Sequence, residues 1–344
     1  MTVEVLGAHE RRWDELVEAS PAADVYYGRG YCRAYEAAGH GRAVAVVTDG
    51  ALFPLMLRPL PFGEEGFDAA TPYGYGGVLP RGRDTFAAEP MPDAEVRQLR
   101  DWCATAGVVS CLLRLHPLLG GPGQLSQAAS PGMDLDIREH GPTTAIDLAR
   151  LTDGRLEGMT KGRKGDLTIA RRELELSWGG EDALERFREI YDGTMRRVGA
   201  GEFYLFPPAY YGSLADGLGD RLGVALALLD GEPVGGALFL AGRRFAHYHL
   251  SGTTEAGREL KAGTMLVHAG AEWARDRGCE LLHLGGGTSG ADSLFAFKKS
   301  FGGETHTYAF ATLVADRERY GALAARRAEE PEPPRPDFFP AYRA

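Results

Sequence analysis

The stretch Gly223-Val-Ala-Leu-Ala-Leu-Leu-Asp-Gly-Glu-Pro-Val-Gly-Gly-Ala-Leu-Phe-Leu240 consists of two apolar runs joined by Asp-Gly. Asp-Gly between apolar runs is the strongest short signal for a β-hairpin, because both residues tolerate the left-handed backbone that the turn needs. The segment from Ala43 to Leu57 repeats this arrangement around Asp49-Gly50. The sequence therefore predicts two hairpins, one in each half of the chain.

The elements around the hairpins also recur in the same order. An aromatic-rich segment and a helix precede each hairpin, starting at Val25-Tyr-Tyr and at Phe203-Tyr-Leu-Phe. Each hairpin is followed by a segment with Tyr and Gly, a helix and a buried strand, predicted at residues 108–115 and 280–284. This order predicts that one α/β unit has been duplicated.

A chain of 344 residues is long enough for two such domains. We expect the first over residues 1–150 and the second, with the catalytic segment, over residues 151–315. Residues 316–344 are predicted to form a C-terminal helix and a Pro-rich tail, since Pro and charged residues near Glu329 do not favour packing.

Composition excludes several classes of protein. The net charge of −10 argues against a protein that coats nucleic acid along long basic tracks. No run of 18 or more apolar residues indicates a membrane helix, and no secretory signal is apparent, so we expect a cytoplasmic protein that does not bind membranes. The four cysteines show no zinc-ligand spacing and are expected to be buried and reduced; they are Cys32, Cys103, Cys111 and Cys279.

The most unusual stretch runs from Leu281 to Gly303. A buried strand leads into a glycine loop that includes Gly285 and Gly286, and a short helix is predicted to start at Asp292 or Ser293. Backbone N–H groups in such a loop favour an anion or an oxyanion, although Gly-Gly-Gly also serves any sharp turn. A nucleotide-binding P-loop is excluded, because the required Gly-Lys-Ser/Thr is absent.

Lys298 is the principal candidate in this helix. Its neighbours Phe297 and Phe301 are aromatic, so the lysine stem could lie on an aromatic surface while the ammonium faces a cleft. The alternative is that Lys298 and Lys299 are two ordinary surface lysines.

A segment around Tyr248 predicts a strand with His247 and His249 on one face and Tyr248 on the other. No third ligand stands at a supporting distance from the histidines, so we predict no metal. Tyr248 is either a cleft residue or a core tyrosine. Tyr73 and Tyr75 lie in the corresponding segment of the first half.

Basic residues suggest two further contacts. Arg197, at the end of a predicted helix before the aromatic run with Tyr204, could bind a phosphate or carboxylate, or could offset the helix dipole. The stretch with Arg163 and Lys164 is the one concentrated basic segment, suited to phosphates or an RNA end, or else a solvated helix face.

These residues resemble the Fem-like aminoacyltransferases and their BioF-like acetyltransferase relatives, a branch of the GNAT superfamily with two tandem GNAT domains. The resemblance is most specific at residues 191–206, at Tyr248-His-Leu-Ser-Gly252, at Leu284-Gly-Gly-Gly and at Leu294-Phe-Ala-Phe-Lys-Lys-Ser-Phe-Gly302. It implies an α/β (α+β) fold of two GNAT-like domains, each a mixed, mostly antiparallel sheet flanked by helices. The long coiled-coil arm of some members has no counterpart, because no heptad run is present.

The resemblance implies transfer of an amino acid from the acceptor end of aminoacyl-tRNA to an amine, without a further cofactor. Lys298 matches the catalytic lysine of the family and Phe297 the aromatic residue beside it. The family's substrate cleft implies catalytic or binding roles for further residues, which are Tyr248, Arg197, Tyr204, Tyr73, Tyr75, Gly285, Gly286, Arg163 and Lys164. The oligomeric state is not indicated.

The acceptor is expected to be a small amine or peptide natural product. Members that act on peptidoglycan precursors carry a lysine on the first helix, where this chain offers Tyr35 with Arg33 nearby. Two rival functions stay open. An acyl-CoA N-acyltransferase would need a glycine pattern that Arg258 to Thr264 does not meet, and a binding module without activity would not need Lys298.

Overall fold

The structure is a computed structural model that describes residues 3–83, 90–125, 134–180, 182–287 and 290–344. The chain forms two compact units: unit 1 comprises Met1–His140 and Thr307–Ala344, and unit 2 comprises Gly141–His306. Unit 1 thus combines the beginning and the end of the chain. The division into domains at residues 150 and 315 stays a prediction.

Unit 1 is built on a mostly antiparallel sheet with the strand order β1-β2-β3-β4-β6-β15, with β5 beside β3. Its strands are β1 (Glu4–Gly7), β2 (Arg42–Val47), β3 (Ala51–Pro59), β4 (Phe67–Ala70), β5 (Leu79–Pro80), β6 (Val108–Leu115) and β15 (Glu304–Val314). The first residues of β15 belong to unit 2, and the rest of this strand belongs to unit 1. Its helices are α1 (Arg12–Glu18), α2 (Arg29–Ala37), α3 (Asp93–Thr105) and α10 (Arg317–Ala328). Within this sheet β4 and β6 are parallel neighbours.

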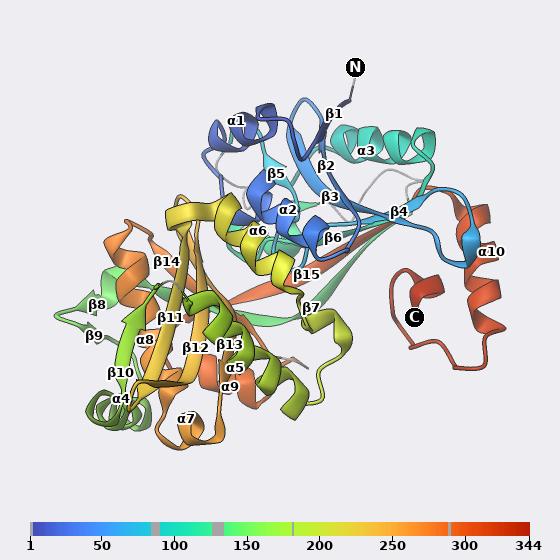
Figure 1. Ribbon diagram of the computed structural model, residues 1–344. Helices are drawn as coiled ribbons and strands as arrows, with labels where there is room; N and C mark the ends of the chain where they lie inside the picture. Colours follow the sequence, from blue (N-terminus) through green and yellow to red (C-terminus); the bar gives the residue numbers. More distant parts are fainter. Residues whose placement is uncertain (1–2, 84–89, 126–133, 181, 288–289) are drawn as a thin grey trace. The chain divides into compact units, whose positions relative to one another are not determined.

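Unit 2 repeats this plan with the strand order β10-β11-β12-β13-β14-β7 (Figure 1). Its strands are β7 (Asp134–Asp147, which starts in unit 1), β10 (Glu175–Trp178), β11 (Leu222–Leu229), β12 (Glu232–Ala241), β13 (Phe245–Thr253) and β14 (Leu281–Gly286), with a separate ribbon of β8 (Leu151–Thr152) and β9 (Arg155–Leu156). Its helices are α4 (Lys161–Glu173), α5 (Ala183–Arg197), α6 (Pro208–Leu218), α7 (Glu255–Glu259), α8 (Ala262–Asp276) and α9 (Ser293–Lys299). Here β13 and β14 are the parallel neighbours.

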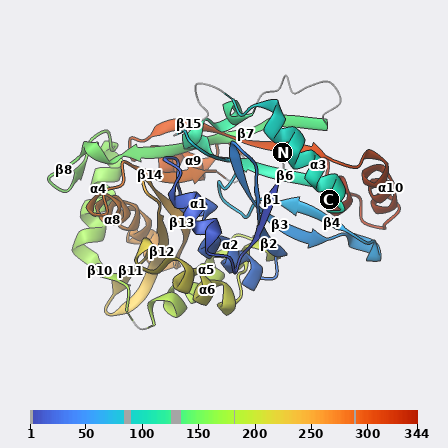
Figure 2. The same cartoon turned by 90° about the horizontal axis from the view of Figure 1, so that it is seen from above.

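The strands of the two units therefore follow one topology, and the predicted fold class is confirmed. Each set of strands is mixed, mostly antiparallel and flanked by helices, as Figures 1 and 2 show. Among the described helices the longest have 15 residues, and no coiled-coil arm is present. None of these helices is long and apolar enough to cross a membrane.

Two adjacent glycines explain how helices cover both faces of the unit 2 sheet. Successive residues of a strand point to opposite faces. A Cβ at Gly235 would lie 2.9 Å from Cβ of Ala262 in α8, and one at Gly236 would lie 2.9 Å from Cδ2 of Phe187 in α5. The strand β12 is thus held between α8 on one face and α5 on the other, at a distance that only glycine allows.

The predicted hairpins are confirmed as β2–β3 and β11–β12. At the second turn Asp230 and Gly231 have φ of 51° and 83°, the left-handed backbone expected of Asp-Gly. The strand predicted at residues 108–115 is β6 itself. The four cysteines are free and buried, as expected, and burial raises the pKa of Cys103 to about 12.

The alternation predicted for β13 is wrong in one respect. Its register against β12 passes from Tyr248 opposite Phe239 to Leu250 opposite Leu238, so that His249 is the extra residue of a β-bulge. A bulge breaks the alternation of side chains. Nε2 of His249 and the hydroxyl of Tyr210 form a hydrogen bond of 2.8 Å.

The C-terminal residues are held against the rest of unit 1 by the buried carboxylate of Asp68. Asp68 of β4 is fully buried and forms ion pairs with Arg58 and with Arg343. Next to it the hydroxyl groups of Tyr342 and Ser110 are 2.7 Å apart and buried. Removing either arginine would leave a buried charge short of a partner, which is costly in a low dielectric.

We expect the substitution Arg343→Ala to lower the free energy of unfolding of unit 1 by about 1–3 kcal/mol. Urea unfolding followed by tyrosine fluorescence measures this. Arg326→Ala is the control, because Arg326 and Glu64 form an ion pair with both side chains about half exposed, and such pairs contribute about 0–1 kcal/mol. Equal effects of the two substitutions would contradict the account of Asp68.

Candidate active site

Unit 2 contains a place where two parallel strands separate, which we call the unit 2 fork. β13 and β14 pair as far as His247 and His283. Beyond this point Tyr248 pairs with β12, whereas Gly285 and Gly286 pair with β7. The backbone between the separating strands is left without a strand partner, and it offers its polar groups to other atoms.

Lys298 is directed to the unit 2 fork. It lies in the last turn of α9, and its Nζ donates a hydrogen bond of 2.7 Å to the carbonyl oxygen of Gly286, the last residue of β14. An ammonium has three donors, of which the described residues accept this one. Lys299 differs: its exposed side chain donates to the Gly303 carbonyl oxygen and to Thr305.

Burial and a nearby carboxylate shift the pKa of Lys298. Burial lowers the pKa of Lys298 to about 8, while the negative charge of Asp292 acts in the opposite direction. Asp292 is also the N-cap of α9, since its Oδ1 accepts the N–H of Phe295 at 2.9 Å. The sequence predicted a helix start at Asp292 or Ser293, and the structure has Asp292 as the N-cap. The effect of the Asp292 charge on the lysine was not predicted.

Arg163 holds the helix that carries Lys298. Its Nε donates to Ser300 at 3.1 Å, and its Nη1 donates to Thr264 at 3.1 Å and to Asp166 at 2.8 Å. The guanidinium also lies 4.7 Å from the centre of the Phe297 ring. Arg163 thereby links α4, α8 and α9, and Figure 2 shows α4 and α8 side by side. The predicted residues Arg163, Phe297, Lys298 and Gly286 are brought together.

Tyr248 lies at the first position of β13 beyond the pairing with β14. It is half-buried against the core of unit 2, with its ring centre 5.5 Å from that of Phe239. Burial raises the pKa of Tyr248 to about 12, and a hydrogen bond with Ser251 partly offsets this. At neutral pH the side chain is a phenol that can donate a proton in a hydrogen bond.

Gly285 has φ of 76°, the left-handed region that favours glycine. A Cβ at Gly286 would lie 2.7 Å from the carbonyl oxygen of Pro142. These two glycines therefore fix the path of the backbone whose carbonyl oxygen accepts from Lys298. The predicted loop continues through Thr288 and Ser289, which lie outside the described residues.

Other predicted residues of unit 2 lie at different places on its surface. Arg197 is exposed, and its Nη1 donates to the carbonyl oxygen of Thr253 at 2.8 Å. Tyr204 is 38% exposed and packs edge-to-face with Phe203. Lys164 is exposed on α4. Among the described residues, none of these three is a hydrogen-bond partner of Lys298.

Tyr73 and Tyr75 belong to unit 1 and are both half-buried. The carbonyl oxygen of Tyr73 accepts from the hydroxyl of Tyr31 at 2.6 Å. The Tyr75 ring is 4.9 Å from that of Tyr308, edge-to-face. Both residues thus line a tyrosine-rich part of unit 1.

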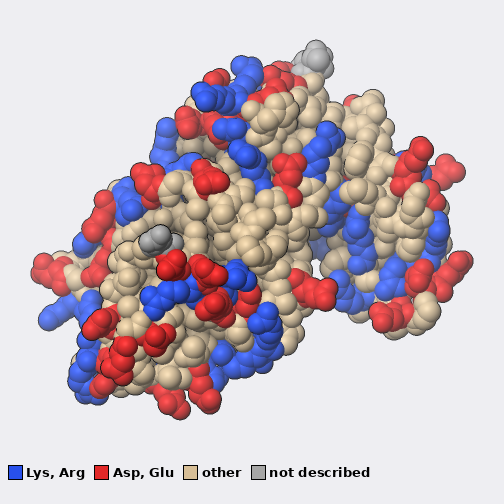
Figure 3. All heavy atoms as spheres, viewed as in Figure 1, with Lys and Arg blue, Asp and Glu red and all other residues tan. Residues whose placement is uncertain are grey.

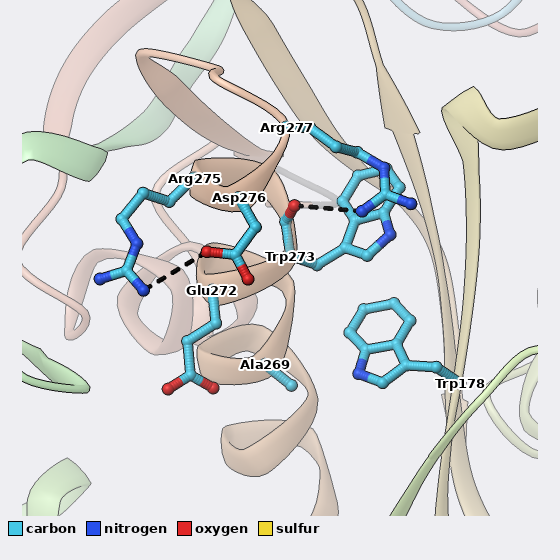
Figure 4. Close-up of a pocket in the computed structure, with 7 residues that line it drawn as sticks. All are labelled: Trp178, Ala269, Glu272, Trp273, Arg275, Asp276 and Arg277. Atoms are coloured by element: carbon cyan, nitrogen blue, oxygen red, sulfur yellow. Dashed lines mark hydrogen bonds and ion pairs between the residues drawn. The ribbon is translucent and has the colours of Figure 1, made fainter.

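A groove of about 410 Å³ lies elsewhere on unit 2, and none of the predicted site residues lines it. Figure 4 shows Trp178 and Trp273 on one side of Ala269 and the carboxylates of Glu272 and Asp276 on the other. The two indole rings are nearly parallel, with centres 5.9 Å apart, and Arg277 lies over Trp273.

Comparisons with known proteins show which domains and folds this chain is similar to. Residues 159–299, which include Arg163, Tyr248 and Lys298, match the acetyltransferase (GNAT) domain family. No curated protein matches the sequence.

Solved structures match nearly the whole chain. FemX is 14% identical with a TM-score of 0.66, over 90% of this chain and 97% of FemX. L-PGS from Bacillus licheniformis is 12% identical with a TM-score of 0.57, over 89% and 92% of the two chains. A tandem GNAT protein from the clavulanic acid biosynthesis pathway is 15% identical with a TM-score of 0.52, over 91% and 99%.

Residues 159–299 of unit 2 are therefore similar to a GNAT acetyltransferase domain. The whole chain has the fold of FemX and of a tandem GNAT protein, as the resemblance to the Fem-like branch of the GNAT superfamily predicted for its fold. At these identities the likeness defines the fold, and the reaction has to be argued from the residues of the site.

The environment of Lys298 predicts one lysine that titrates near pH 8, well below the ordinary lysine pKa of about 10.4. Because Lys occurs at only five positions of the sequence, NMR of protein labelled with ¹³C at lysine Cε can follow each signal. The signal lost in Lys298→Arg should be the one with the low pKa. An ordinary pKa for that signal would show that the nitrogen is hydrated as in bulk water.

Proposed function

We propose that the protein is an aminoacyltransferase that transfers an amino acid from aminoacyl-tRNA to the amine of a small natural product or peptide. The observation that carries this proposal is the half-buried Nζ of Lys298, held on the Gly286 carbonyl oxygen at the unit 2 fork. A fixed ammonium with two remaining donors is suited to an oxyanion that develops during acyl transfer.

The reaction needs little from the enzyme beyond position and charge. The acceptor nitrogen attacks the ester carbonyl carbon, and the carbonyl oxygen becomes negatively charged. When the amide forms, the bond between the acyl carbon and the ribose oxygen breaks, and the proton lost by the amine balances the one gained by the ribose hydroxyl. Lys298 would stabilise the oxyanion, and Tyr248 would donate a hydrogen bond to substrate.

The beginning of α8 favours an ester donor over acyl-CoA. GNAT enzymes that use acyl-CoA hold its pyrophosphate at the N-terminus of a helix. Here the Phe297 ring comes within 3.6 Å of a Cβ built on Gly263, and Arg163 donates to Thr264. Side chains of α9 and α4 thus cover the first turn of α8, and the segment from Arg258 to Thr264 lacks the glycine pattern.

Two exposed lysines at the start of α4 could contact an RNA phosphate. Lys161 and Lys164 are exposed, and no described carboxylate forms an ion pair with either. The face shown in Figure 3 mixes acidic and basic side chains. This distribution fits contact with one end of an RNA better than a long nucleic-acid track.

The acceptor is proposed to be a small amine or peptide, with a peptidoglycan precursor as a less favoured alternative. Tyr35 stands where relatives that bind such precursors carry a lysine. It is 1% exposed, and its hydroxyl is 3.2 Å from that of Tyr31. A buried phenol offers no charge to a diphosphate.

The second candidate is an acyl-CoA-dependent N-acyltransferase, which the description of the matching family favours. The test offers radiolabelled aminoacyl-tRNA or acetyl-CoA to the purified full chain with a panel of amines. Labelled amide from aminoacyl-tRNA supports the first proposal. Amide formed only from acetyl-CoA overturns it in favour of the second.

With the active donor, we expect Lys298→Ala to lower kcat/KM by about 10²–10³-fold, since one oxyanion donor contributes about that much. Lys299→Ala is the matched control, because Lys299 is exposed and donates to Gly303 and Thr305 instead of Gly286, and the rate of this variant should stay within a few-fold of the parent. Tm measurements establish that both variants are folded. A Lys298→Ala rate equal to the control would exclude Lys298 from the reaction.

A further inference from the structure

Unit 1 has a fork of its own, the unit 1 fork, at the matching place of its sheet. The parallel strands β4 and β6 pair as far as Ala70 and Leu112. Two residues further along β6, the backbone N–H of Arg114 donates to Oγ1 of Thr71 at 3.0 Å, and its Nη1 donates to the carbonyl oxygen of Thr71. The Arg114 guanidinium therefore lies across the opening of the fork.

The charge of Arg114 has no counterion among the described residues. None of their carboxylates lies within 4.0 Å of this guanidinium, whose one acceptor there is the carbonyl oxygen of Thr71. Arg58, on β3 at the other side of β4, is by contrast paired with Asp68. Arg114 is half-buried. A half-buried cation with unused donors favours an anionic partner, because withdrawal from water is otherwise uncompensated.

Aromatic side chains lie near the Arg114 guanidinium. Phe310 of β15 is the cross-strand partner of Arg114 and lies 4.6 Å from the ring of His140. The Tyr308 ring is 5.0 Å from that of Phe310. These rings are partly or fully exposed, so they are open to a ligand.

His40 and His140 respond to the same charge. Burial is the first cause that lowers the pKa of each, and the positive charge of Arg114 lowers both further, together with Arg58 at His40. Both imidazoles are therefore neutral at pH 7 and carry one N–H each that could donate to an anion. The two histidines also report on any change of charge at Arg114.

We propose that the unit 1 fork is a binding site for a carboxylate or phosphate group of a ligand, with Arg114 as the anchoring residue. A guanidinium presents its donors as a fork that matches both groups. Phe310 and Tyr308 take the apolar part of the same ligand. The site is defined by binding and does not depend on the transfer reaction; on the proposed function its ligand is the amine acceptor.

The test is an NMR titration of the full chain with succinate and with inorganic phosphate, observing the histidine rings. We expect the signals of His40 and His140 to shift saturably, whereas His9, whose side chain is 87% exposed at another place, should not. A response to succinate alone identifies a carboxylate ligand, and a response to phosphate alone identifies a phosphate ligand.

Arg114→Gln should weaken the binding at least about tenfold, because charge-assisted hydrogen bonds are lost. Arg12→Gln removes an exposed arginine paired with Glu4 and should leave it unchanged. Arg114→Lys keeps the charge in case the first variant does not fold, and should still bind more weakly than the parent. Shifts that do not saturate, or equal affinities of the parent and a folded Arg114 variant, overturn the proposal.

Discussion

The separation of β13 and β14 beyond His247 and His283 is the constraint on which the site depends. While the strands pair, their backbone groups are satisfied and nothing else can approach. Where they part, the carbonyl oxygen of Gly286 becomes the acceptor for Lys298. The short helix α9, capped by Asp292 and fixed through Arg163, sets the position from which the lysine reaches it.

The duplication gives the two forks different cations. Lys298 in unit 2 is an ammonium whose pKa burial lowers to about 8, while Arg114 in unit 1 presents a planar guanidinium. A lysine with rotatable donors suits charge that appears only during a reaction, whereas a planar guanidinium suits a group that is always anionic. Proposed catalysis and proposed ligand binding thus divide between the units according to the chemistry of each residue.

The sequence predicts those features that depend on neighbouring residues. Asp-Gly between apolar runs predicts both hairpins, and the apolar run at residues 108–115 predicts β6. The bulge at His249 could not be predicted, because it depends on the register of a partner strand. The pairing of β7 with β14 and of β15 with β6 could not be predicted either, because each pairing joins residues that lie far apart in the chain.

The candidate site shows the same limit. The pattern Phe297-Lys298 identifies the residues, but no spacing indicates that Arg163 donates to Thr264 about 100 positions away. Arg163 consequently acts in the structure as a link between helices, and the proposed contact with RNA rests on Lys161 and Lys164 instead. Arg114 lies in no recognisable sequence motif. Its proposed role follows from the structure, in which no described carboxylate pairs with it.

Lys298 is proposed to act in its protonated form at the unit 2 fork, and the pH dependence of the transfer rate follows the loss of that proton. The rate should fall as the pH rises through about 8, where the ammonium loses its proton. Asp292→Asn keeps an N-cap but removes the charge that raises this pKa, so the fall should move to lower pH. A rate that keeps rising above pH 8, or a profile unchanged in Asp292→Asn, would contradict the account.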